Sequence, residues 1–164
     1  DFYRPTAPFA VKSIDLTYDK TGNPELFAID PYFGHVFYLN LDANGVATNT
    51  IFLQAGTAIV SSIALGQDAN NDPLVFGIGS NYQVVELKLD NNGKPVGDFF
   101  ATRPSVVSIT SITVTYGGTG LPQLFGIGLG DDQIYEETFD ASGNMIRSFF
   151  RVSSSAVAGL AVSH

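Results

Sequence analysis

Short apolar runs alternate along this chain with clusters of turn-forming residues. The runs are rich in Val, Ile, Thr, Phe and Tyr, and Asn, Asp and Gly separate them. No window combines the 3.6-residue apolar spacing of an amphipathic helix with the residues that cap helices. The pattern therefore predicts β-strands throughout and an all-β protein.

The strand pattern recurs with a nearly constant period. Ile14, Ile63 and Ile112 lie 49 residues apart, and Leu160 follows 48 residues later. A second landmark keeps the same spacing, since Phe27, Phe76 and Phe125 each lie within a segment that starts with Pro. Such self-similarity is typical of proteins built from stacked structural units.

Each repeat contains the signals of four strands joined by short turns. The segments 41–45, 89–93 and 139–143 read as hairpin turns in which Gly supplies a positive φ. Aromatic pairs at 99–100 and 149–150, with weaker copies at 51–52 and 2–3, indicate a fourth strand. Strands centred near Ile14, Phe27, 37–41 and Phe52 would form one antiparallel meander.

Four-stranded units of this length are typical of β-propeller blades. Small residues beside the strand aromatic, at Ala28, Gly77 and Gly126, would allow close packing of adjacent sheets. The predicted fold is therefore a tandem array of antiparallel blades of about 49 residues, as a partial ring or a ring completed by association. Three repeats also fit a β-trefoil, but the first and fourth strand types each occur four times.

These landmarks divide a single domain of residues 1–164 into five segments. The divisions are a fourth-strand-like segment at 1–9, repeats at 10–58, 59–107 and 108–155, and a first-strand-like segment at 156–164. The chain therefore carries three complete repeats and two additional single strands.

The charge of the chain argues against two classes of partner. Its 16 Asp and Glu residues outnumber its 8 Lys and Arg residues, for a formal charge of -8. This excess would repel nucleic acid phosphates and anionic lipid headgroups, so neither nucleic acid binding nor membrane insertion is expected. No cofactor is predicted. Asp68 and Asp72 flank an oxygen-rich loop that is a weak candidate for calcium, although Asx turns explain the same residues.

The recurring motifs invite comparison with known repeats. Ser-Ile, Leu-Phe-Gly-Ile-Gly, Gln-Val-Val or Gln-Ile-Tyr, and Phe-Phe recur in order, and this pattern resembles the blades of bacterial surface and secreted propeller proteins. It is more distantly similar to tectonin-like and related propeller lectins, whose blades are rich in tryptophan, whereas this chain has none. The resemblance implies a recognition role and an extracellular or cell-surface location in a bacterium.

Two carboxylate pairs are the raw material of acid–base chemistry on glycosides, namely 131–132 and 136–137. Glu136 and Glu137 are consecutive in a strand, so they point to opposite faces and cannot converge on one bond. His35 aligns with Gln83 and Gln133 and has no evident nucleophile partner. The chain is therefore predicted not to be an enzyme.

One end of the predicted blades gathers the candidate ligand-binding residues. The turn after the second strand and the loop after the fourth emerge together in a meander, and aromatic rings beside Arg and amide groups suit sugars or peptide surfaces. The candidates are Tyr32, Phe33, His35, Tyr82, Arg103, Asp131, Asp132 and Arg151.

The arginines could equally pair with nearby carboxylates to hold the loops. The predicted function is a binding module for a carbohydrate or a partner protein. The alternative is an assembly protein whose blades self-associate between chains, and a hydrolase ranks last.

Overall fold

The chain forms β-strands and no helix in the part that the structure describes. The computed structural model describes residues 11–18, 21–53, 59–90, 100–101 and 107–160. The strands are β1 Ser13–Tyr18, β2 Pro24–Ile29, β3 Val36–Leu41, β4 Ala47–Leu53, β5 Val60–Gln67, β6 Pro73–Gly79, β7 Val84–Lys88, β8 Phe100–Ala101, β9 Ile109–Tyr116, β10 Pro122–Gly128, β11 Ile134–Phe139 and β12 Met145–Arg151.

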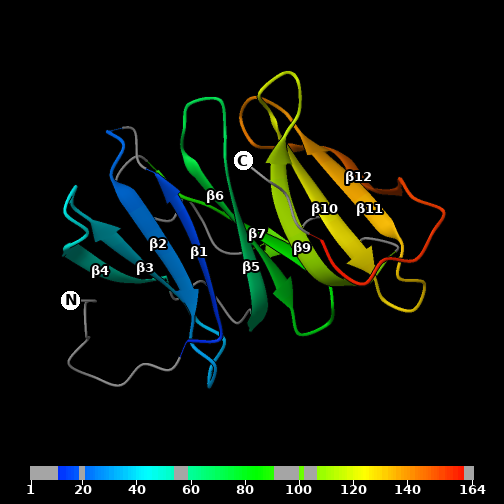
Figure 1. Ribbon diagram of the computed structural model, residues 1–164, viewed down its shortest axis with the longest axis horizontal. Helices are drawn as coiled ribbons and strands as arrows, with labels where there is room; N and C mark the ends of the chain where they lie inside the picture. Colours follow the sequence, from blue (N-terminus) through cyan, green and yellow to red (C-terminus); the bar gives the residue numbers. More distant parts are fainter. Residues whose placement is uncertain (1–10, 19–20, 54–58, 91–99, 102–106, 161–164) are drawn as a thin grey trace.

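These strands form three separate four-stranded sheets, and in each sheet the spatial order follows the chain. All neighbouring strands pair antiparallel. Figure 1 shows the three sheets side by side, with β1–β4 at the left, β5–β8 in the middle and β9–β12 at the right. This arrangement confirms the all-β, propeller-type prediction. It excludes the β-trefoil, in which the repeats would share one closed barrel. The exact repeat boundaries stay a prediction.

Neighbouring sheets pack face to face through two apolar clusters. One cluster joins repeats 1 and 2 and includes Phe27, Ile29, Val36, Tyr38, Ile63, Val75, Val85 and Leu87. The other joins repeats 2 and 3 and includes Leu74, Phe76, Ile78, Val84, Ile112, Val114, Leu124 and Phe139. Each sheet thus has one face toward the preceding repeat and one toward the following repeat, and the middle sheet is covered on both.

A left-handed turn residue ties each repeat to the next. Gly34, Tyr82 and Asp132 occupy equivalent turn positions with φ of 67°, 61° and 52°. Their carbonyl oxygens accept hydrogen bonds from the backbone N–H groups of Val60, Ile109 and Val157 at 3.1, 2.7 and 2.7 Å. The positive φ of each turn residue directs its carbonyl oxygen toward the backbone N–H at the start of the next repeat. The hydrogen bond between repeats therefore accounts for this uncommon backbone conformation.

The two predicted single strands have different outcomes. Residues 1–9 lie outside the described residues. The first-strand-like segment at 156–164 is not a strand over its described part, 156–160. The backbone N–H of Val157 nevertheless donates a hydrogen bond to the carbonyl oxygen of Asp132, at the place where the first strand of a fourth repeat would begin. A second strand to pair with it is absent from the described residues near this end, which explains why no ladder forms. No helix in the described part has the length and apolarity to cross a membrane.

Candidate functional site

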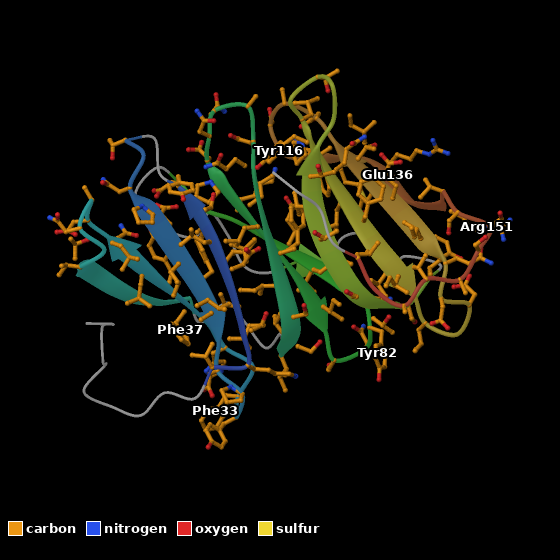
Figure 2. The ribbon with its side chains drawn as sticks, viewed as in Figure 1. Phe33, Phe37, Tyr82, Tyr116, Glu136 and Arg151 are labelled. Carbon is orange, nitrogen blue, oxygen red and sulfur yellow. The ribbon has the colours of Figure 1, made fainter. Side chains whose placement is uncertain are left out.

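The turns that follow β2, β6 and β10 lie at the same end of their sheets, and we call this surface the turn face. It comprises residues 30–35, 80–83 and 129–133. In Figure 2, Phe33 and Tyr82 lie along one edge of the molecule and Tyr116 lies at the opposite edge. The structure thus brings the sequence-predicted turn residues to one end, as the meander pattern required.

The first turn presents a pair of stacked rings to solvent. The rings of Phe33 and His35 lie 5.6 Å apart at an interplanar angle of 18°. Tyr32 is 78% exposed and Phe33 is 64% exposed. The backbone beneath them is held by Asp30, whose carboxylate accepts a 2.8 Å hydrogen bond from the N–H of Tyr32. A flat apolar surface with adjacent polar groups can hold the apolar face of a ring-shaped ligand.

The third turn carries a polar network. Asp131 accepts a 2.6 Å hydrogen bond from the hydroxyl of Tyr135, and Arg151 donates a 3.1 Å hydrogen bond to the side-chain oxygen of Gln133. The Tyr135 hydroxyl is the main cause that lowers the pKa of Asp131 below its ordinary value, with the N–H of Gln133 and the charge of Arg151 adding to it. Asp131 is therefore held as a carboxylate that can accept hydrogen bonds from a ligand.

Sequence reasoning named only part of this network. The sequence allowed two equal roles for the arginines, either ligand binding or pairing with carboxylates to hold the loops. Arg151 instead donates a hydrogen bond to the side-chain amide oxygen of Gln133 in the turn. Tyr135 and Gln133 were missed as members, although both follow Asp131 at two-residue spacing, which puts alternate strand side chains on one face. Arg103 lies outside the described residues.

Tyr82 and Asp132 reach the turn face as exposed side chains. Both adopt the left-handed backbone that presents their carbonyls to the next repeat. Their positions are thus set by the architecture, and their side chains remain available to a ligand.

The weak calcium candidates form a backbone turn. One oxygen of the Asp68 carboxylate accepts hydrogen bonds from the N–H groups of Asn70 and Asp72 at 2.7 and 3.0 Å. This is the geometry of an Asx turn. The described residues contain no group of three or more His, Cys, Asp or Glu side chains that could hold a metal ion. Calcium binding by Asp68 and Asp72 stays an untested prediction.

Three glutamates are buried among the described residues, and none was anticipated; Glu25 accepts a hydrogen bond from the Tyr38 hydroxyl, whereas Glu86 and Glu137 lie in a junction between sheets. Glu86 pairs with Phe76 and Glu137 pairs with Leu124 in their sheets, so both side chains point into the cluster between repeats 2 and 3. Glu86 is 1% exposed and Glu137 is fully buried. Both carboxyl oxygens of Glu137, and Oε1 of Glu86, lack a hydrogen-bond partner among the described residues. The sequence indicated that Glu136 and Glu137 face opposite ways, and the structure places Glu137 in the buried junction and Glu136 on the half-buried opposite face.

Burial dominates the ionisation of this pair. Desolvation raises the pKa of Glu86 to about 7 and the pKa of Glu137 to about 8, where the charge of Glu86 adds to the effect. A carboxyl group without hydrogen bonds in an apolar junction is more stable in its neutral form. Both groups lie between two sheets, so they are components of the packed junction.

No known family model matches this chain, and no curated protein is similar to it in sequence. Solved structures do resemble it. A Bifidobacterium bifidum S17 protein described as an exo-beta-1,3-galactanase superposes with a TM-score of 0.68 at 16% identity, over 94% of this chain and 56% of that protein. The endo-arabinase of Bacteroides thetaiotaomicron VPI-5482 superposes with a TM-score of 0.62 at 12% identity, over 93% of this chain and 67% of that protein.

These similarities show the fold, and they correct one prediction. The sequence predicted that this chain is not an enzyme, because it contains no recognisable catalytic constellation. That prediction is contradicted, since proteins with the same fold are named as an exo-galactanase and an endo-arabinase, and the fold therefore gives no ground for excluding enzymatic activity. The physical reason is that a scaffold of stacked sheets places its active groups on loops, where single-sequence patterns carry little signal.

Proposed function

We propose that this chain is a propeller-type protein that recognises carbohydrate on its turn face. The observation that carries the proposal is the exposed ring of Phe33, stacked on the half-buried ring of His35, with the exposed Tyr32 next to Phe33 in the same turn. Exposed aromatic rings cost free energy in water, and the apolar face of a sugar ring covers them well. The substrate class is taken from the names of the two structural neighbours, which are those of a galactanase and an arabinase.

The polar network of the third turn would bind a more distant part of the saccharide chain, because Phe33 and Arg151 lie at opposite sides of the molecule (Figure 2). Asp131 offers carboxylate oxygens, and Arg151 and Gln133 offer donors, which match the hydroxyl groups of a saccharide. Because sugars are neutral, binding would depend little on ionic strength, whereas an ionic protein partner would respond to salt. We place this activity outside the cell or at the bacterial cell surface, where polysaccharides are found.

Binding of β-1,3-galactan and arabinan oligosaccharides, measured by calorimetry, tests the proposal. Phe33→Ala is expected to weaken binding by about tenfold, the equivalent of ~1.4 kcal/mol. Tyr116→Ala is the matched control, because this exposed tyrosine lies at the opposite edge of the molecule (Figure 2). Equal losses in both variants, or no binding of either saccharide by the native chain, contradict the proposal.

The same two polysaccharides serve to measure hydrolysis through the release of reducing ends. Glycoside hydrolysis uses an ionised carboxylate together with a protonated acid. Asp131 is the turn-face carboxylate whose pKa is lowered, mainly by the Tyr135 hydroxyl, so it would serve as the ionised member. If sugar is released, Asp131→Asn should abolish the release while leaving stacking on Phe33 intact.

A further inference from the structure

An apolar stripe on β1 has no covering sheet among the described residues. Ile14, Leu16 and Tyr18 are 59%, 43% and 54% exposed. They alternate with Asp15, whose carboxylate accepts a 2.9 Å hydrogen bond from the backbone N–H of Leu65 in repeat 2. Because alternate strand residues face opposite ways, the stripe points away from repeat 2.

The repeats themselves show what such a stripe packs against. Ile63 and Ile112 occupy the position of Ile14 one and two repeats later, and they are only 6% and 8% exposed. Each is covered by the sheet of the preceding repeat. The stripe is therefore the receiving half of a junction that this chain forms twice internally.

The opposite half of that junction is incompletely covered at the other end of the chain. Phe27 and Phe76 are fully buried by the next repeat, whereas Phe125, at the same position in repeat 3, is only half-buried. Glu136, labelled in Figure 2, is likewise half-buried, whereas Tyr38 and Glu86, at the same position in repeats 1 and 2, are buried. Within its described residues, one molecule thus carries both halves of a sheet-to-sheet junction that no other described sheet fills.

We propose that two copies of this chain pair head to tail, the β1 stripe of each covering the outward face of repeat 3 in the other. A second copy is the occupant that fits because it presents the repeat equivalent of the surfaces already joined inside each chain. Two such junctions would close a ring of six repeats, which lies within the roughly four to eight blades of known propellers.

The C-terminal segment is the competitor that this pairing displaces. Val157 enters the position beside repeat 3 where the first strand of a following repeat belongs. Residues 157–160 form no strand there, so they cover this position with fewer backbone hydrogen bonds than a complete sheet would make. The β1 strand of a second copy, already paired within its own sheet, would pack there with fewer unsatisfied groups.

Native mass measured by light scattering over a concentration series tests the pairing. The expected result is twice the 17.5 kDa of one chain. The double variant Ile14→Lys with Leu16→Glu should lose the two-copy mass, and Ile59→Lys should keep it. Ile59 is the matched control because it is 57% exposed in the connection between repeats 1 and 2, outside both halves of the proposed interface. A one-copy mass at all concentrations, or pairing that survives the double variant, overturns the proposal.

A mixing experiment then tests the orientation. Phe125→Lys should also be a monomer, with Thr138→Lys as the milder change on the same face if the first variant fails to fold. Mixed with the β1 double variant, either one should recover a two-copy mass, because the mixture retains one intact junction. Absence of recovery overturns head-to-tail pairing, and a mass above two copies overturns the closed ring.

Discussion

Replacing Glu137 with leucine should stabilise this protein and remove part of its dependence on pH. Glu137 is fully buried and both of its oxygens lack hydrogen-bond partners among the described residues. Repeats 1 and 2 place Leu39 and Leu87 at the equivalent strand position, opposite the residues that match Leu124. The Glu137→Leu change therefore installs a side chain that the junction between repeats 1 and 2 already accommodates as Leu87.

The magnitude follows from the shift in pKa. Burial raises the pKa of Glu137 from an ordinary value of 4.5 to about 8. Below pH 4.5 the group is neutral in both the folded and unfolded states and leaves the free energy of unfolding unchanged. As the pH rises from 4.5 toward 8, the unfolded chain releases the proton first, so stability falls. At pH 7 the penalty is ~3 kcal/mol, from about 1.36 kcal/mol for each pKa unit.

Urea unfolding followed by far-ultraviolet circular dichroism at pH 5, 6, 7 and 8 measures this effect. The stability gain of Glu137→Leu over the native chain should grow by ~1.4 kcal/mol for each pH unit up to pH 7. Glu137→Gln is the control, since it abolishes ionisation but keeps a buried polar group, and it should flatten the pH dependence with a smaller overall gain. An equal gain at pH 5 and pH 7 would refute the reasoning, because Glu137 would then not be releasing its proton on unfolding.

Two further substitutions test the packing and the turn face. Gly77→Ala should destabilise the fold by ~1–3 kcal/mol in urea unfolding, because its new Cβ would lie 2.5 Å from a methyl group of Val60. Gly118→Ala, where no atom lies within 4 Å, should have little effect, and equal losses in the two variants would contradict the steric explanation. Tyr135→Phe should raise the pKa of Asp131 toward 3.8, since the Tyr135 hydroxyl is the main cause of its lowering. Carboxyl carbon shifts in an NMR titration measure that pKa, and an unchanged value would assign the lowering to the backbone and Arg151.

The strands and their order were predictable from local pattern. The period of 49 residues, the Pro-led second strands and the Gly-containing turns are short-range signals, and each reports on a few neighbouring residues. Asp42 illustrates this, because its carboxylate accepts hydrogen bonds from the N–H groups of Asn44 and Val46 within the same turn. Such turns form wherever that local sequence occurs, so the meander could be derived without coordinates.

The functional surface was predictable in outline only. A meander places the turns of β2, β6 and β10 at one end, which located Phe33, Tyr82 and Asp131 correctly on one face. The stacking of Phe33 on His35 and the bond from Tyr135 to Asp131 depend on rotamers that a sequence does not specify. The prediction of a non-catalytic chain failed because the fold does not exclude activity and groups on loops leave little signal in a single sequence.

The repeat, the strands and the turn chemistry can be derived from the sequence alone, because they follow from contacts between residues close along the chain. Which face of each sheet is covered depends on the packing of whole sheets and is seen only in three dimensions. Ile14 and Ile63 are the same residue in equivalent strands, yet one is exposed and the other buried, according to whether a sheet precedes it. Glu136 and Glu137 likewise separate into a half-buried residue bonded to Gln123 and a fully buried one without a partner. Burial depends on which sheets lie next to each other, and that arrangement sets the ionisation and the open junction of this protein.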